Sequence, residues 1–312
     1  MISIILPAYD PNDSYVDAGI LPRLLEKTLR LEGEWELIIV NNNAPGPTKL
    51  RTYLKSVEDG NRIKVVDEQK NLGTSGGFNA GLKAAHPQAT CYIFMSSDAD
   101  IVDYKILGKI EQAFNIDDRI GIIHPYSVLE DSNEYNINVR FSNKRMYSAI
   151  KAGSVPTEVE PTDSEVAEYA RRLALRRCTV TGYRSFPLTF AAIRRTVIDR
   201  IGSFDLGVEL VCHENDDLAF RTLKAGFVVG RLNCAFINHR RLTVRNLSLK
   251  SEVDRTKLPH IAVMGLATDW WMKKYKKPYL YLYVEWKYGK IFGTLLISCL
   301  KFRKIVQKAC GS

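Results

Sequence analysis

Four short apolar runs alternate with helical stretches along the start of the chain, and this alternation constrains the fold more than any other feature. The runs cover Ile2–Leu6, Trp35–Val40, Ile63–Val66 and Cys91–Met95. Each is short and bounded by polar or turn-forming residues, which is typical of buried strands. Between them, apolar residues recur at helical spacing, as in Ile20–Leu31. Because strands that alternate with helices pair in parallel through right-handed crossovers, the sequence predicts an α/β fold with a mostly parallel sheet flanked by helices.

Two carboxylates follow the fourth apolar run directly. Asp98 and Asp100 come after Met95 and are separated by one residue. In an open parallel sheet, ligands bind at the carboxyl ends of the strands. Carboxylate oxygens are hard ligands for a divalent cation, which can bridge to the phosphates of a nucleotide. A solvated acidic turn would also explain the pair, so the weight of this motif depends on the others.

A second acidic cluster consists of Glu214, Asp216 and Asp217, directly after His213 and at the start of a predicted helix that ends near Gly226. A helix dipole stabilises negative charge at its N-terminus by about 0.3–1 kcal/mol per charge. One carboxylate would satisfy such a cap. The presence of three therefore indicates a chemical role in addition to capping.

The segment Asn71–Gly81 is rich in glycine and opens a predicted helix that runs through Ala85. It lacks the Gly-Lys-Ser/Thr ending of a P-loop and the strict dinucleotide-binding pattern. The helix N-terminus would still favour an anion, whereas Gly76 and Gly77 would equally permit close packing of the helix on the sheet. Both interpretations stay open at this point.

Cysteine usage and the start of the sequence predict a cytoplasmic protein. The six cysteines are scattered without zinc-like spacing, so reduced thiols are the simplest expectation. The first apolar run follows Met1 at once, without the features of a secretory signal peptide. With 312 residues, of which 46% are hydrophobic, the chain can form one large α/β domain and an extension.

The last part of the chain, from residue 251 to 312, interleaves aromatic and basic residues. It contains Trp270–Lys277 and Trp286–Lys290 and carries much of the excess behind the net charge of +9. Charged residues interrupt the apolar stretches, so a transmembrane span is not expected. The composition favours an interfacial helix on an anionic membrane, with packing on the preceding domain as the alternative. Nothing resembles a nucleic-acid-binding module, so no nucleic-acid partner is expected.

Taken together, these motifs resemble the inverting glycosyltransferases of family 2, which have a GT-A fold. The residues that carry the resemblance are, in order, Pro7–Asp10, Val40–Ala44, Asn71–Asn79, Asp98–Asp100, Ile201–Asp205, Glu214–Arg221 and Asn238–His239. The resemblance spans roughly residues 1–240. It implies a GT-A domain with a nucleotide-sugar-binding half (1–125) and an acceptor-binding, catalytic half (126–250), followed by a basic, aromatic helical tail (251–312).

The resemblance also implies a donor site at the carboxyl ends of the first strands. The residues that would line the base and ribose are Pro7, Ala8, Tyr9 and Asp10, and those that would complete the donor site are Asn42, Asn71, Gly76, Gly77 and Asn79. Asn42 stands where relatives often carry an aspartate, and its carbonyl can still accept a hydrogen bond from the base. Asp98 would face the ribose or the metal, Asp100 would bind Mn²⁺ or Mg²⁺ directly, and His239 would be a further ligand.

In the reaction that the resemblance implies, an acceptor hydroxyl attacks the anomeric carbon opposite the departing nucleoside diphosphate, and a carboxylate takes its proton. Glu214, Asp216 and Asp217 are the candidates for this base. Relatives generally use the residue after the glutamate, which here is Asn215 and is not a useful base. Asp217 is favoured because it keeps the family's spacing to Arg221.

The expected donor is UDP- or dTDP-linked, and the expected acceptor is a lipid-linked saccharide at the inner face of the membrane, as in the synthesis of bacterial surface polysaccharides. A homo-oligomer is compatible with the sequence. Two other classes stay open. A sugar-1-phosphate nucleotidyltransferase would share the layout but would normally carry a glycine-rich loop with Arg and Lys after the first strand. A non-catalytic carbohydrate-binding protein is suggested by Asn42 and Asn215 in place of acids.

Overall fold

The computed structural model describes residues 1–10, 13–42, 48–127, 162–207, 213–239, 269–277 and 279–289, with single positions at 291, 295 and 298. Its strands are β1 (Ile2–Ala8), β2 (Trp35–Asn41), β3 (Ile63–Asp67), β4 (Cys91–Met95), β5 (Ala99–Ile101), β6 (Ile120–Ser127), β7 (Val180–Tyr183), β8 (Phe190–Arg194) and β9 (Val228–His239). Its helices are α1 (Ser14–Asp17), α2 (Ile20–Leu29), α3 (Lys49–Val57), α4 (Gly73–Ala84), α5 (Ile106–Phe114), α8 (Asp163–Ala174), α9 (Arg195–Ile201), α10 (Glu214–Lys224) and α13 (Tyr279–Tyr288). The element types predicted for the first 95 residues are therefore confirmed.

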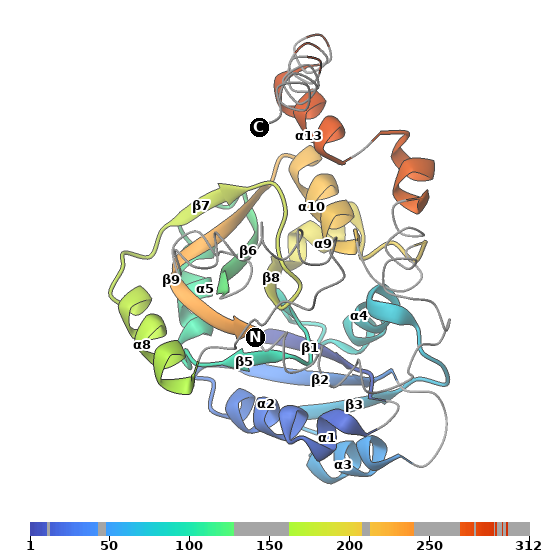
Figure 1. Cartoon of the computed structure of the whole chain (residues 1–312), viewed down its shortest axis with the longest axis vertical. Helices are drawn as coiled ribbons and strands as arrows, with labels where there is room; N and C mark the ends of the chain where they lie inside the picture. Colours follow the sequence, from blue (N-terminus) through green and yellow to red (C-terminus); the bar gives the residue numbers. More distant parts are fainter. Residues whose placement is uncertain are drawn as a thin grey trace, which may run out of the picture.

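All nine described strands belong to one sheet, in the order β3-β2-β1-β4-β8-β6-β9-β5, with β7 paired to β9 (Figure 1). The first four pair in parallel, with Ile4 opposite Leu37 on one side of β1 and opposite Ile93 on the other. Strand β8 then runs antiparallel between β4 and β6. Strands from both predicted halves of the domain therefore share one sheet, while the predicted domain borders remain predictions.

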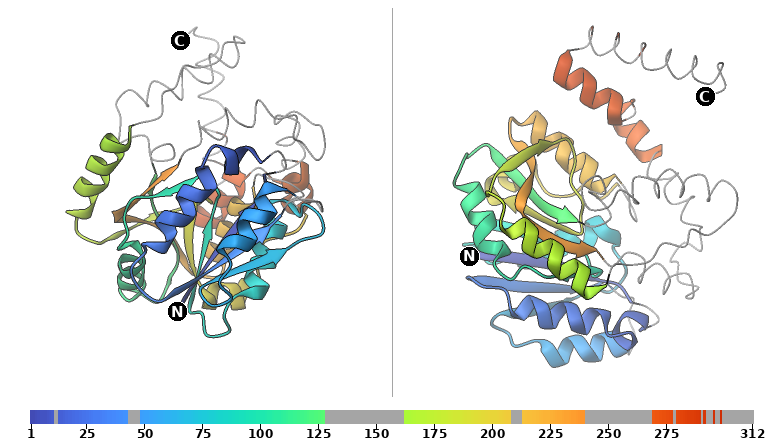
Figure 2. Two further views of the ribbon diagram at one scale, coloured as in Figure 1. Left: turned by 90° about the horizontal axis from the view of Figure 1, so that it is seen from below. Right: turned by 60° about the vertical axis from the view of Figure 1, so that its left-hand side comes forward.

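Helices cover both faces of this sheet and form a three-layer structure. Alternate residues of β1 point to opposite faces, so that Ile4 packs with the core under α2, α3 and α5, and Ile5 packs with the core under α4, α9 and α10. Figures 1 and 2 show α1, α2 and α3 together on one side of the sheet. A third, smaller core lies between α8 and Phe236 of β9. Because β1 to β4 run in parallel, their carboxyl ends lie at the same end of the sheet.

Close contacts around α4 explain three glycines of the glycine-rich segment, since Gly77 and Gly81 face β1 and Gly76 faces Leu72 at the start of α4. A Cβ atom at Gly77 would lie 2.9 Å from Cβ of Pro7, and one at Gly76 would lie 2.5 Å from Cβ of Leu72. At Gly81 the clash would be with Cγ2 of Ile5, at 2.3 Å. Separations this short do not fit van der Waals contact between carbons, so packing alone requires glycine at these positions, and the predicted donor contacts of Gly76 and Gly77 remain predictions.

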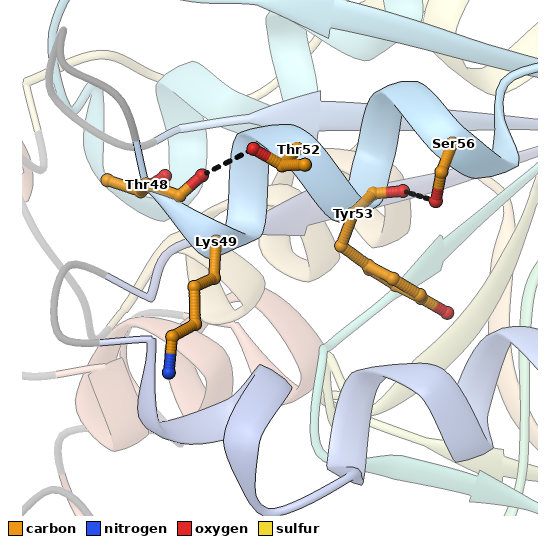
Figure 3. A pocket seen from close by; sticks show the side chains of 5 residues that line it. All are labelled: Thr48, Lys49, Thr52, Tyr53 and Ser56. Atoms are coloured by element: carbon orange, nitrogen blue, oxygen red, sulfur yellow. Dashed lines mark hydrogen bonds between the residues drawn. The ribbon is translucent and has the colours of Figure 1, made fainter.

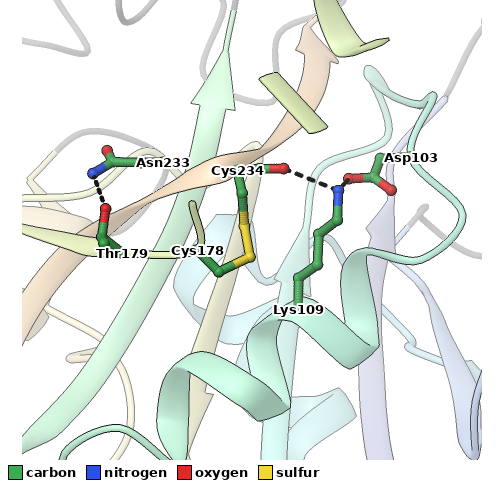
Figure 4. The surroundings of a disulfide bond; sticks show 6 residues. All are labelled: Asp103, Lys109, Cys178, Thr179, Asn233 and Cys234. Atoms are coloured by element: carbon green, nitrogen blue, oxygen red, sulfur yellow. Dashed lines mark hydrogen bonds and ion pairs between the residues drawn. A yellow bond between two sulfur atoms is a disulfide. The ribbon is translucent and has the colours of Figure 1, made fainter. Parts of the chain in front are cut away.

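A disulfide joins Cys178, just before β7, to Cys234 in β9 (Figure 4). The expectation of reduced thiols is therefore wrong for this pair, because the sheet brings together two cysteines that lie 56 positions apart in the sequence. Cys91 is a free, buried thiol, and Cys212, Cys299 and Cys310 lie outside the described residues. Cysteine usage thus no longer supports a reducing compartment, and the cytoplasmic location remains a prediction.

Loss of the disulfide is expected to lower the free energy of unfolding by about 2–4 kcal/mol, because the bond restricts the unfolded chain over a long loop. The measurement compares urea unfolding of the Cys178→Ser/Cys234→Ser variant with that of the parent protein. Unfolding with and without dithiothreitol is the matched control, since only the parent should respond. Equal midpoints for the parent and the double variant would show that the bond does not contribute.

The start of the basic tail packs on the domain. Residues 269–277, named here the anchor segment, begin with a helical stretch at residues 269–275. Trp271 is only 1% exposed, and its ring lies 4.4 Å from that of Tyr275. This segment therefore packs on the domain, while the predicted membrane contact of the tail remains a prediction. Helix α13 extends away from the sheet beyond it (Figures 1 and 2), and no helix in the described part of the chain is long and apolar enough to span a bilayer.

Candidate active site

Asp98 and His239 meet at the carboxyl end of β4. The short strand β5 pairs with the end of β9, so that Ala99 lies opposite His239, and Nε2 of His239 lies 3.0 Å from Oδ2 of Asp98. The other ring nitrogen, Nδ1, lies 3.1 Å from the hydroxyl of Thr189. The Thr189 hydroxyl therefore fixes the orientation of the His239 ring, with Nε2 facing Asp98, as second partners do for imidazoles that face a carboxylate or a metal.

The environment of Asp98 keeps its carboxylate ionised. Burial acts to raise its pKa, but the neighbouring His239 and hydrogen bonds from His239 and Ser96 outweigh burial, so the pKa lies below its ordinary value. The Ser96 hydroxyl donates to Oδ1 at 2.5 Å. An ionised carboxylate beside an imidazole offers an oxygen ligand of the kind that Mn²⁺ and Mg²⁺ prefer, together with a nitrogen ligand that favours a transition metal such as Mn²⁺ over Mg²⁺. The described residues contain no cluster of three or more acidic, histidine or cysteine side chains suited to hold a metal.

Asp100 lies in a different environment from Asp98. It is 2% exposed, forms an ion pair with Lys27 of α2, and accepts a hydrogen bond at 3.2 Å from the amide of Asn238. Arg23 approaches the same carboxylate at 3.6 Å. The structure therefore uses Asp100 to join α2 to β5 and β9, and its role as a direct metal ligand remains a prediction.

The second acidic cluster begins α10, and Asp216 is its accessible member. The side chain of Asp216 is 23% exposed, and its Oδ2 lies 3.0 Å from Nδ1 of His213. Its Oδ1 accepts a hydrogen bond at 2.6 Å from Ser185. Glu214 is buried, and the amide of Asn215 donates to the carbonyl of Phe186 at 2.7 Å. Among the three predicted acids, Asp216 is thus the one best placed to meet a substrate.

The loop at residues 184–189, named here the bridging loop, connects the two acidic clusters. Ser185 of this loop holds Asp216, and Thr189 lies against His239. The carbonyl of Thr189 also accepts from the Ser96 amide at 3.1 Å. Four residues of extended chain span at most about 14 Å, so Ser185 and Thr189 cannot be farther apart. The bridging loop therefore links the Asp98–His239 pair to Asp216 through one short stretch of chain.

Asp217 faces the anchor segment. Its side chain is 0% exposed and accepts from Lys274 at 2.5 Å, from Arg221 at 2.8 Å, and from the hydroxyl of Tyr275. Burial and the bond to Asp217 raise the pKa of Tyr275 well above its usual range. Asp217 is thus buried and ties the tail to α10, and its role as the base remains a prediction.

Replacing Asp217 by asparagine is expected to lower the free energy of unfolding by about 3–5 kcal/mol, because Lys274 and Arg221 would lose their buried counter-charge. Urea unfolding followed by circular dichroism measures this change. Asp199→Asn is the matched control, because its ion pair with Arg195 is exposed and should contribute less than about 1 kcal/mol. Equal destabilisation by the two substitutions would rule out the structural role of Asp217.

The residues predicted to contact the donor lie at the expected edge, and several of their side chains hold the backbone there. Asn42 accepts from the Leu72 amide at 2.8 Å and donates to the Gly73 carbonyl at 3.0 Å, which fixes the turn before α4. Asn71 accepts from the Gly73 amide at 2.8 Å. Asp10 is buried and accepts from the amides of Tyr15 and Val16 at the start of α1.

Asn79 pairs with both backbone groups of Phe204, with contacts of 2.8 and 3.1 Å. Its amide is therefore used to join α4 to the turn after α9. Pro7, Ala8 and Tyr9 continue β1 to the same edge, with the Ala8 carbonyl accepting from the Asn42 amide at 2.8 Å. As donor contacts, these residues remain predictions.

An open pocket of about 390 Å³ lies along α3 and is lined by Thr48, Lys49, Thr52, Tyr53 and Ser56 (Figure 3). The ammonium group of Lys49 pairs with Asp17 at 2.8 Å. None of the acids or histidines described above lines this pocket. We therefore do not assign it a catalytic role.

Several residues of the site carry no signal in the sequence. Ser96, Ser185 and Thr189 are single hydroxyl residues in ordinary loops, and only the sheet pairing brings them to the acids. Lys274 and Tyr275 belong to a basic, aromatic run whose composition suggested a membrane surface. His213 is different, because its position directly before the acidic cluster was a sequence signal for its contact with Asp216.

Comparisons with known proteins agree with this architecture. The family described as "Glycosyl transferase family 2" matches residues 3–202, which span β1 to α9 and include Asp98. The crystal structure of GalNAc-T7 with UDP, GalNAc and Mn²⁺ is similar, with a TM-score of 0.51 and 12% identity over 77% of this chain, which covers only 43% of that protein. The mannosyltransferase PcManGT from Pyrobaculum calidifontis, in complex with GDP-Man and Mn²⁺, has a TM-score of 0.51 and 12% identity over 97% of this chain and 80% of its own.

At these identities the two structures show a shared fold. No match was found among curated proteins. The family match covers well over half of the sequence. The chain therefore belongs to glycosyl transferase family 2 and has the α/β fold of GT-A glycosyltransferases.

Proposed function

We propose that this protein is a metal-dependent, inverting glycosyltransferase that moves a sugar from a nucleoside-diphosphate donor to a saccharide acceptor. The observation that carries the proposal is the bridging loop, which links the Asp98–His239 pair to Asp216. An inverting transfer needs a positive site for the departing diphosphate and a base on the opposite side of the sugar. In this proposal the Asp98–His239 pair belongs to the site of the departing diphosphate, and Asp216 is the base.

Asp98 and His239 fit a divalent cation of the kind present in the two similar structures. When bound, Mn²⁺ or Mg²⁺ neutralises the charge that develops on the leaving diphosphate. Thr189 orients the His239 ring, and Ser96 holds the Asp98 carboxylate. Asp98 and His239 are the residues that would hold the cation, and it would supply positive charge for the leaving diphosphate.

Asp216 acts in this proposal as the base that takes the proton of the acceptor hydroxyl. A positioned base of this kind typically contributes 10²–10⁴-fold to the rate. Ser185 and His213 hold the two oxygens of its carboxylate, and each oxygen keeps a further lone pair for a proton. Glu214 is buried beside it and completes the acidic start of α10.

A panel of UDP-, dTDP- and GDP-linked sugars, each with Mn²⁺ or Mg²⁺, tests the proposal. A donor that binds the native state raises the melting temperature by mass action, and slow release of its nucleoside diphosphate reports turnover. We expect stabilisation that requires both the cation and a sugar nucleotide. Release of pyrophosphate from a nucleoside triphosphate and a sugar phosphate would instead indicate a nucleotidyltransferase, and binding without turnover of any donor would indicate a non-catalytic protein.

We further propose that the tail beyond the anchor segment contacts the inner face of a membrane, where a lipid-linked acceptor of bacterial surface polysaccharide synthesis would lie. Trp286, Ile291 and Leu295 are large and exposed, and Lys287 lies among them in the sequence. Apolar side chains next to basic ones favour an anionic membrane interface. The lipid-linked acceptor, the membrane contact and the formation of a homo-oligomer are all proposals.

Co-sedimentation with vesicles tests the membrane contact in the full chain. Ile291→Glu/Leu295→Glu is expected to reduce binding to anionic vesicles severalfold, while neutral vesicles bind both proteins weakly. Leu175→Glu is the matched control, because Leu175 is also exposed but lies at the end of α8. The proposal fails if the tail variant and the control bind anionic vesicles equally well.

A further inference from the structure

The histidine before the acidic cluster has an unusual backbone. His213 caps α10 with φ +65°, in the left-handed region, and is one of the few described residues other than glycine with a positive φ. Left-handed backbone is uncommon for residues other than glycine, although histidine adopts it more often than most, and it persists where the surroundings hold the residue in place. The contacts of its ring show what holds it.

The ring of His213 lies between Asp216 and the anchor segment. On one side, its Nδ1 is 3.0 Å from Oδ2 of Asp216. On the other side, the ring centroid is 5.6 Å from that of Trp271, with the planes tilted by 46°. Trp271 is buried, and its Nε1 donates to the Lys277 carbonyl at 2.8 Å. The tryptophan therefore provides a fixed surface against which the imidazole rests.

The anchor segment is itself fixed to α10 next to this contact. Lys274 and Tyr275 both bind Asp217, the residue directly after Asp216. Lys274 also reaches Asp205 at 2.7 Å. The start of α10 is thus held from the tail side at two neighbouring positions, through the Asp217 carboxylate and through the His213 ring.

From this geometry we infer that His213 is a positioning residue for Asp216, and that Trp271 of the anchor segment holds His213 in place. With Nδ1 protonated, the imidazole donates to Oδ2, so that Ser185 and His213 together restrict the carboxylate to one orientation. The inference rests on the proposed role of Asp216 as the base. It makes the first part of the tail a structural component of the active site, in addition to any role of later residues at a membrane.

Two substitutions at position 213 separate the side chain from the backbone. Glycine accepts the left-handed backbone but offers no hydrogen bond, whereas asparagine tolerates that backbone and its amide can donate to Asp216. With the donor identified by the panel, His213→Gly is expected to lower kcat by about 10²-fold, as for a displaced catalytic group, with the KM for the donor unchanged. His213→Asn should recover most of the loss. His86→Gly is the control, because it makes the same substitution just before β4, at the opposite end of that strand from Asp98.

A cycle of melting temperatures tests the contact itself without any substrate. His213→Gly, Asp216→Asn and the double variant should give shifts that do not add, because each single substitution already breaks the same bond. Additive shifts, an unchanged kcat in His213→Gly, or a loss expressed only in the KM for the donor would each overturn the positioning role. Failure of the parent protein to turn over any sugar nucleotide would overturn the proposed function, while the melting cycle would still decide whether His213 holds Asp216.

Discussion

Asp98→Asn is expected to reduce the release of nucleoside diphosphate from the donor by about 10³-fold. Asparagine keeps the shape of the side chain but removes the charge that pairs with His239 and, in our proposal, with the cation. Loss of a metal ligand removes several kcal/mol of stabilisation of the leaving group, and about 4 kcal/mol corresponds to this factor. The measurement is turnover as a function of Mn²⁺ concentration, and added Mn²⁺ should not restore the variant.

Two further substitutions show whether the loss is specific. Asp103→Asn removes a nearby acid that pairs with Lys109, and it should leave turnover and the response to Mn²⁺ unchanged. Asp100→Asn distinguishes the two aspartates of the motif. It should act on stability, through the lost ion pair with Lys27, and leave the response to Mn²⁺ intact. If Asp100→Asn abolished that response while Asp98→Asn kept it, Asp100 would be the metal ligand.

Asp216→Asn is expected to lower kcat by 10²–10⁴-fold, the usual contribution of a general base, with little change in the KM for the donor. Asparagine can still accept the hydrogen bond from Ser185, so the site should keep its shape while losing the group that takes the proton. Single-turnover transfer to an acceptor measures this effect, and donor-dependent melting confirms that binding is retained.

Asp217→Asn is the informative comparison for this prediction, because it changes the neighbouring acid. If Asp217 is structural, its variant should lose stability first and should keep kcat at temperatures well below its melting point. The opposite pattern, with Asp216→Asn fully active and Asp217→Asn folded but inactive, would return the base role to Asp217.

The fold of the first 95 residues could be predicted because periodicity and turn residues act locally. The runs at Ile2, Trp35, Ile63 and Cys91 became β1 to β4, and the helical spacing after Ile20 became α2. Later strands were harder, since β5 has three residues and β9 contains the polar residues Asn233 and Asn238. Their pairing depends on partners far away in sequence. The Cys178–Cys234 disulfide escaped prediction for the same reason.

The site was predicted as a set of motifs, but the role of each carboxylate depends on its neighbours in space. Asp98 and Asp100 differ by two positions, and only the structure shows that His239 faces one and Lys27 the other. Asp216 and Asp217 likewise differ in their surroundings, because the anchor segment covers Asp217 and leaves Asp216 partly exposed. Composition suggested that Trp271 belongs to a membrane surface, whereas its burial shows that an aromatic, basic run can serve as a packing element.

The most direct test of the account is a titration of Mn²⁺ followed by electron paramagnetic resonance, in the presence of UDP, dTDP or GDP. The account predicts that the parent protein with one of these nucleotides removes free Mn²⁺ from solution, and that Asp98→Asn and His239→Ala abolish this uptake while Asp103→Asn retains it. Undiminished, nucleotide-dependent uptake of Mn²⁺ by both the Asp98 and the His239 variants would contradict it.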